Sequence, residues 1–217
     1  MPLQRSEVVT AAMRILDGAG LDALTTRKLA SELNVRPGAL YWHVSSKQDL
    51  LDSLTEKILE EVGTPPLAPR ESWEDGVRTL VHRLRDTLVA HRDSARLLAG
   101  AGGLGPNRLR IADHLMGLLR LTGAPVAATA YGSDTLLSYV TGFVLQEQSE
   151  PDHSAPDEAD GGLDVLDVLD EKLFPHLAAW AQGWSPDDRG LSFAAGLEVL
   201  VGGLDRYLAA QAKSATD

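Results

Sequence analysis

Apolar residues recur with the period of an α-helix along most of this 217-residue chain, and this pattern restricts the possible folds most strongly. Val9, Ala12, Met13 and Leu16 follow the i, i+3, i+4, i+7 spacing that places side chains on one helical face. Aromatic residues make up only 5% of the chain, and leucine and alanine dominate it, which favours helix over sheet. No segment has a convincing strand pattern or an internal repeat, so we predict an all-α fold.

Local signals place the ends of several helices. Gly18 and Gly20 are expected to end the first helix, Thr25 suits an N-cap, and Asn34 suits the left-handed conformation that closes a helix. Ser46 followed by Asp49 predicts a capping box at the start of a further helix. The predicted helices cover approximately Val9–Leu16, Thr26–Leu33, Pro37–His43, Lys47–Val62, Val77–Leu88, Leu109–Leu119, Pro125–Gln148, Leu163–Gln182 and Pro186–Leu208.

Three stretches interrupt this helical pattern. Residues 64–69 contain three prolines, which remove backbone donors and clash with a continuing helix. We place the domain boundary there, between a small head at residues 1–63 and a larger body at residues 70–217. The glycines of residues 99–106 break the chain again. Residues 149–162 are acidic, contain two prolines and carry no lysine or arginine, which predicts a mobile loop.

The charge of the chain is unevenly distributed. The whole chain carries 20 Lys+Arg and 31 Asp+Glu, a formal net charge of −11. Residues 1–48 carry six basic and four acidic side chains, or +2, which leaves −13 for the rest. This asymmetry suggests that the N-terminal head binds an anionic partner and that the acidic body does not. The absence of cysteine excludes a disulfide scaffold and a zinc finger. No apolar run is long enough to span a membrane and no signal core follows the first residues, so we expect a cytoplasmic protein.

The segment from Thr25 to His43 has the spacing of a helix-turn-helix, in which the second helix enters the major groove of DNA. Basic and hydroxyl side chains at helix N-termini suit phosphate groups, and exposed aromatic residues with polar hydrogens can donate to phosphate oxygens. Small residues permit close approach to bases. The candidate DNA-binding residues are Thr26, Arg27, Lys28, Arg36, Pro37, Gly38, Ala39, Tyr41, Trp42, His43 and Lys47. The alternative is a three-helix packing unit in which Tyr41 and Trp42 are core residues.

Several runs of residues in the head resemble a known family. Leu24 to Leu33, Leu40 to Val44 and Lys47 to Leu51 are similar to the TetR family of transcriptional repressors, and to its tetracycline-repressor subclass in particular. Looser similarities to that subclass continue in order along the body. They are Glu71-Ser72-Trp73, His91-Arg92-Asp93, Gly142 to Gln148 and Phe193 to Glu198.

The resemblance implies a homodimer that binds a palindromic double-stranded DNA operator and is released by a small-molecule inducer. The dimer would form through two helices, at about 125–148 and 186–208. Gly196, Gly202 and Gly203 would permit close helix contact across the two-fold axis, or would pack inside one subunit. In the family, the inducer enters the body and the fourth helix swings, so that the two heads no longer match adjacent grooves.

Departures from the subclass change the expected ligand and operator. Gly63, Leu80 and Leu98 stand where the tetracycline repressors hold the drug and its magnesium, so we expect no tetracycline–magnesium site, no metal and no cofactor. An apolar cavity with a few polar groups would suit a largely apolar ligand. Its candidate residues are Leu80, Arg83, Leu84, Leu98, His114, Leu115, Met116 and Ser138, although each leucine is equally well explained as core. Pro37-Gly38-Ala39 replaces two base-reading polar residues, which leaves Arg36 as the expected guanine contact.

Other patterns do not support catalysis. The glycines of residues 99–106 follow no predicted strand and precede no Lys-Ser/Thr pair, so they do not form a phosphate-binding loop. The histidines show no HxxxH pair. We therefore expect a ligand-released repressor and not an enzyme. Two alternatives stay open: a ligand-independent regulator or activator with the same head, and a small-molecule carrier that no longer binds DNA.

Overall fold

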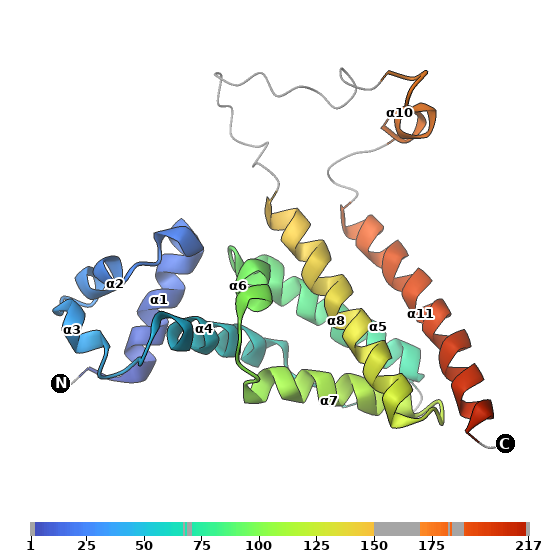
Figure 1. Ribbon diagram of the computed structural model, residues 1–217, viewed down its shortest axis with the longest axis horizontal. Helices are drawn as coiled ribbons and strands as arrows, with labels where there is room; N and C mark the ends of the chain where they lie inside the picture. The colour runs from blue at the N-terminus through green and yellow to red at the C-terminus, as the bar shows by residue number, and fades with distance from the viewer. Residues whose placement is uncertain are drawn as a thin grey trace.

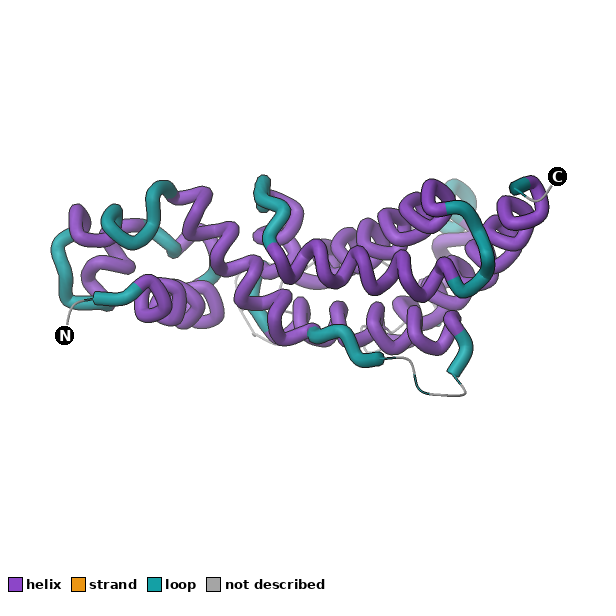
Figure 2. The backbone as a smooth tube through the Cα atoms, turned by 90° about the horizontal axis from the view of Figure 1, so that it is seen from below, coloured by secondary structure: helices purple, strands orange, loops and turns teal. Residues whose placement is uncertain are grey.

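The computed structural model describes residues 3–66, 68, 71–149, 170–181, 183 and 189–215. These residues form helices joined by turns and contain no strand, which confirms the all-α prediction. A small N-terminal head lies at one end of an elongated molecule, and a larger helical body occupies the other (Figures 1 and 2). The fourth helix connects the two (Figure 1).

The head consists of α1 (Arg5–Ala19), the 3-10 helix η1 (Leu21–Ala23), α2 (Thr26–Glu32) and α3 (Pro37–Leu40). Thr25 caps α2 by accepting a hydrogen bond from the backbone N–H of Lys28, as its sequence position predicts. Asn34 has a φ of 53° and turns the chain from α2 toward α3. Apolar side chains that include Leu16, Leu29 and Leu40 are fully buried among these helices.

The third helix is shorter than the sequence pattern indicates. The prediction ran from Pro37 to His43, whereas α3 ends at Leu40 and residues 41–43 form a turn. The backbone N–H groups of His43 and Val44 both donate to the carbonyl of Leu40, which closes the helix there. This early end leaves the side chains of Tyr41 and Trp42 on a turn rather than on a helix.

The fourth helix, α4 (Lys47–Val62), begins at an N-cap formed by Ser46, whose hydroxyl accepts from the backbone N–H of Asp49. The second half of the predicted capping box is wrong. The Asp49 carboxylate accepts from the backbone N–H of Ser45 and from Arg5 of α1, instead of from the N-cap backbone. This ion pair fastens the start of α4 to the head.

The body contains α5 (Trp73–Ala90), α6 (Ser94–Gly100), α7 (Pro106–Arg120), α8 (Val126–Ser149), α10 (Pro175–Ala181) and α11 (Arg189–Ser214). Helix α8 packs against α5, α6, α7 and α11, and this places it at the centre of the body. Buried side chains of the head, α4 and the body form one continuous apolar core.

An aromatic cluster joins α8 to α11. Phe193 has no exposed surface, and its ring stacks on Tyr139 with 5.2 Å between the ring centroids. Phe143 and His82 meet the same ring edge-on, and Arg85 of α5 lies over it at 5.0 Å. The Tyr139 hydroxyl also donates to the carbonyl of Phe193 at 2.8 Å.

Two body elements differ from the prediction. Residues 170–174 are not helical, and α10 begins only at Pro175, because proline is tolerated in the first turn of a helix but not within it. Helix α6 was not predicted. The residues expected to begin a helix at 163 and at Pro186, and nearly all of the predicted loop at 149–162, lie outside the described residues.

Candidate nucleic-acid interface and ligand cavity

The aromatic side chains at the end of α3 are exposed on the head. Trp42 has 88% of its surface accessible and Tyr41 has 60%, which excludes the alternative in which both are core residues. Apolar surface of this kind carries a cost in water unless a partner covers it, and both side chains carry polar hydrogens that can reach phosphate oxygens.

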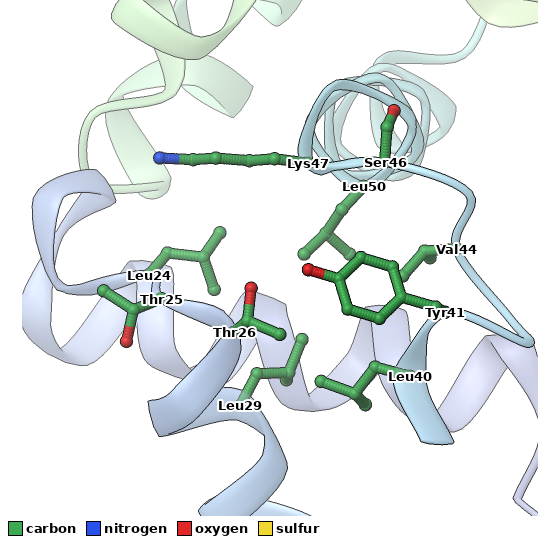
Figure 3. A pocket seen from close by; sticks show the side chains of 10 residues that line it. All are labelled: Leu24, Thr25, Thr26, Leu29, Leu40, Tyr41, Val44, Ser46, Lys47 and Leu50. Atoms are coloured by element: carbon green, nitrogen blue, oxygen red, sulfur yellow. The ribbon is translucent and has the colours of Figure 1, made fainter. Parts of the chain in front are cut away.

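A depression of about 210 Å³ lies between α2, the end of α3 and the start of α4. Buried leucines form its floor, and Thr26, Tyr41 and Lys47 form part of its rim (Figure 3). The Tyr41 hydroxyl is directed toward the side of the depression where Thr26 and Lys47 lie (Figure 3). Thr26, Tyr41 and Lys47 thus bring two hydroxyl groups and one ammonium group to this depression, and groups of both kinds can donate hydrogen bonds to DNA phosphates.

A network around Arg5 fixes the backbone that presents these residues. The Arg5 guanidinium donates to the carbonyl of His43, to the Asp49 carboxylate and to the hydroxyl of Ser53. The hydrogen bonds from Arg5 and from the Ser45 backbone hold the pKa of Asp49 well below its usual range. The turn that carries Tyr41 and Trp42 is thus tied to both α1 and α4, a long-range contact that sequence reasoning did not identify.

The other candidate DNA-binding residues lie on α2, on α3 and in the turn that follows α3, and do not line the depression. Arg27 and Lys28 are exposed in the first turn of α2, and Arg36, Pro37 and Gly38 are exposed at the start of α3. Ala39 and His43 are half-buried. A Cβ atom added at Gly38 would meet no other atom within 4 Å, so this surface is open to a close partner.

A second, larger cavity of about 360 Å³ lies in the body. It opens between α4, α5, α6, α7 and α8, and its size lies in the range of small-molecule sites. Its walls are mainly aliphatic, with Arg108, Asp134, Ser138 and Thr141 as the polar exceptions. The lining residues are Leu59, Leu84, Leu98, Ala99, Arg108, Ile111, Asp134, Leu137, Ser138, Thr141, Gly142 and Leu145.

Three of the predicted ligand-binding residues, Leu84, Leu98 and Ser138, line this cavity together. Leu80 and Leu115 are not among the lining residues and pack in the apolar core instead.

The remaining predicted ligand-binding residues also lie elsewhere. The Arg83 guanidinium donates to the carbonyl of Val62 at the end of α4, at 2.8 Å. Met116 lines a separate shallow groove along α7 with Pro106 and Leu109. His114 is half-buried and is not among the residues that line the cavity.

The α6–α7 connection is attached to α4 through a carboxylate. Gly105 is the N-cap of α7 but has no side chain to accept the free N–H groups of the first turn. The Glu56 carboxylate of α4 accepts instead, at 2.7 Å from the backbone nitrogen of Asn107 and at 3.3 Å from that of Arg108. A Cβ atom at Gly105 would collide with this carboxyl group. A side chain at this position would therefore displace the Glu56 carboxylate, which now links α4 by a hydrogen bond to the backbone of Arg108 in the cavity wall.

Polar contacts also join the head to the α5–α6 junction. His91 lies between Asp17 of α1 and Glu61 of α4, with its ring nitrogens 3.0 Å and 3.2 Å from the two carboxylates. Arg96 of α6 pairs with Asp22 of η1. Burial lowers the pKa of His91, but the hydrogen bonds from its ring to the two carboxylates outweigh that effect, and the pKa is raised.

These contacts predict a pH dependence of stability. A raised pKa in the folded state stabilises the protein fully below the unfolded value of about 6.5, and the stabilisation is lost as the pH rises through the folded pKa. We expect a loss of a few tenths to about 1 kcal/mol, since both carboxylates are partly solvated. Thermal unfolding of the wild type and His91→Gln between pH 6 and 9 checks this. The stability of the variant should not fall over this pH range as that of the wild type does. An identical pH profile for the two proteins would contradict the stabilising role of His91.

Comparison with known proteins identifies the fold family. Residues 8–54 match the family model of bacterial regulatory proteins of the tetR family, and residues 65–208 match that of the tetracyclin repressor-like C-terminal domain. The chain belongs to the TetR family. A TetR-family relative, tetracycline repressor protein class G of Vibrio anguillarum, is 32% identical over 210 residues, which cover 96% of each chain. These relatives are transcription regulators and not enzymes, which confirms the predicted class.

Solved structures of TetR-family regulators have the same architecture. ActR of Streptomyces coelicolor in complex with actinorhodin is 36% identical, with a TM-score of 0.80, and the match covers 94% of this chain and 97% of that one. BioQ with its double-stranded DNA operator is 30% identical, with a TM-score of 0.69, covering 94% and 99%.

The described residues show neither a metal-binding cluster nor a membrane-spanning helix. They contain no group of three or more histidine or acidic side chains placed to hold a metal ion. In the same part of the chain, no helix has the length and apolar character needed to cross a bilayer.

Proposed function

We propose that this TetR-family protein is a repressor that binds a palindromic operator as a homodimer and is released by a small, largely apolar ligand. The observation that supports it best is the position of α4. This helix supplies Lys47 to the depression on the head and Leu59 to the wall of the body cavity. A ligand that changes the position of Leu59 would therefore change the position of the DNA-binding surface.

An uncovered apolar stripe on α11 supports the proposed dimer. Leu191, Ala195, Val199 and Gly202 follow one another at helical spacing, and Leu191 and Val199 are 70% and 74% exposed. The surface around Gly202 and Gly203 is open, as a helix–helix contact across a two-fold axis requires. Gly196 differs from them, because a Cβ atom there would collide with Tyr139 of the same chain. Of the two explanations considered for Gly196, packing inside one subunit fits better.

The test is fluorescence anisotropy of the purified protein on DNA from its own upstream region and on random DNA, at rising salt. The repressor proposal expects tight binding to the upstream fragment with a steep salt dependence. Binding that no ligand releases would favour a ligand-independent regulator or activator. Ligand binding without any DNA affinity would favour a carrier.

Lys47 is expected to contact a phosphate. Replacing it with glutamine should weaken binding to all sequences and lower the slope of log K against log salt by about one. Lys57→Gln is the matched control, because Lys57 lies on the same helix and pairs with Glu60. An unchanged salt slope for Lys47→Gln would exclude the phosphate contact.

Arg36 is expected to read a base. Arg36→Ala should cost about 1–3 kcal/mol on the operator and little on random DNA, because a bidentate contact to guanine discriminates between bases. Anisotropy titrations on the operator, on random DNA and on operators changed at single positions measure this difference. Equal losses on operator and random DNA would assign Arg36 to the backbone instead.

A further inference from the structure

Arg108, a charged side chain in the wall of the body cavity, forms no ion pair with a described residue. Arg108 is half-buried and is the only lysine or arginine among the residues that line the cavity. Its guanidinium makes one long contact, 3.4 Å from Nη1 to the carbonyl of Ala101. Among the described residues, Arg5, Arg78, Arg85 and Arg96 each pair with a carboxylate, whereas no acidic side chain forms an ion pair with Arg108.

The other polar groups of the cavity do not neutralise this charge. Asp134 of α8 also lines the cavity but is solvent-exposed and forms no ion pair with a described residue. Ser138 and Thr141 contribute hydroxyl groups, and that of Thr141 already donates to the carbonyl of Leu137. A guanidinium held beside aliphatic walls gains most from an anion, because charge-assisted hydrogen bonds strengthen where water is displaced.

The position of Arg108 is fixed by its own backbone. Its N–H donates to Glu56 in the first turn of α7, which restrains where the side chain starts. Arg110, two residues further along, lines the shallow outer groove instead of the cavity. The cavity thus offers largely aliphatic walls with one cation, and an exposed carboxylate that can accept from a ligand hydroxyl or amine.

We infer that the cavity binds ligands with an apolar body and one anionic group, and that Arg108 selects for the anion. This inference rests on the proposed ligand-binding function of the cavity. It replaces the expected polar contacts from Arg83 and His114, neither of which lines the cavity. Arg108 would act as a specificity-determining residue, and neutral ligands with the same apolar body would bind more weakly.

Two fluorescent probes with the same ring system test this. They are 1-anilinonaphthalene-8-sulfonate, which carries an anion, and neutral N-phenyl-1-naphthylamine. Titration of the full-length protein should show tighter binding of the sulfonate. Arg108→Gln should weaken sulfonate binding by about tenfold or more and leave the neutral probe within about twofold, since hydrogen bonds to charged groups contribute about 1.5–3 kcal/mol.

Two variants serve as controls. Arg110→Gln removes the same charge from the same helix outside the cavity and should leave both affinities unchanged. Ser138→Trp fills the cavity from an exposed position and should weaken both probes. Unchanged sulfonate affinity in Arg108→Gln, or equal losses for both probes, would overturn the proposal.

Operator binding by the same variants separates this proposal from the proposed function. The operator affinity of Arg108→Gln without probe is measured first, so that release by each probe is compared with that variant's own starting affinity. Selective binding of the sulfonate without release of DNA would support the role of Arg108 and overturn ligand release. Release of DNA by both probes with equal potency would support ligand release and overturn the selection for an anion.

Discussion

In the proposed homodimer, Val199→Arg is expected to produce a monomer and to lower the affinity for a palindromic operator by about a hundredfold or more, because the two heads then bind independently. Val199 lies in the middle of the uncovered stripe on α11. A guanidinium buried against its own symmetry mate in the proposed interface carries both desolvation and repulsion costs. Light scattering after size-exclusion chromatography measures the mass, and anisotropy measures the affinity.

The control for this variant is the same substitution on another helix. Val89 lies on α5 and is 48% exposed, so Val89→Arg should leave both the mass and the operator affinity unchanged. A Val199→Arg protein that remains a dimer would exclude this face of α11 from the interface. A monomer with wild-type operator affinity would show that the operator does not need two heads.

Phe193→Ala should lower the free energy of unfolding by about 3–5 kcal/mol, because a buried phenylalanine leaves a cavity that its neighbours fill only in part. Phe193 supports the rings of Tyr139 and Phe143 and the guanidinium of Arg85, so several contacts are lost together. For a chain of this length the midpoint of thermal unfolding should fall by roughly 6–20 °C. Calorimetry at a fixed protein concentration measures both quantities.

Trp42→Ala provides the comparison for that loss. It also removes an aromatic side chain, but Trp42 is exposed on the head, so its stability should change by about 0.5 kcal/mol or less. Similar decreases in the free energy of unfolding for the two variants would contradict the role of Phe193 as a core residue. The Trp42 variant should instead lose affinity for DNA, since its ring belongs to the proposed DNA-binding surface.

The parts of the fold that depend on local sequence were predictable. The apolar period indicated the long helices, and the cap at Thr25 and the left-handed Asn34 marked the turn of the helix-turn-helix. Helix α6 has only seven residues, too few for a clear period beside a glycine-rich stretch. The early end of α3 could not be predicted, since none of residues 41–43 is a glycine or a proline.

Contacts between distant segments were not predictable. Glu56 and Asn107 are far apart in the sequence, and nothing in either segment indicates that the carboxylate of one caps the helix of the other. The same holds for the pairing of Arg5 with Asp49. The lining of the cavity was not predictable for a related reason. Leu80 and Leu84 lie on the same face of α5, and only the packing of the neighbouring helices determines that Leu84 lines the cavity and Leu80 does not.

Helix α4 is held at its C-terminal end, so a small rotation there becomes a larger displacement at its N-terminal end. Its 16 residues span about 24 Å, with Arg83 holding the Val62 end and the DNA-binding surface at the other end. A tilt of roughly 10° about the held end would displace the far end by about 4 Å, more than the rise of about 3.4 Å between base pairs. In a two-fold dimer, opposite displacements of the two heads would add. A ligand that fits the cavity without tilting α4 would therefore bind without effect, so occupancy and induction are separate properties of an effector.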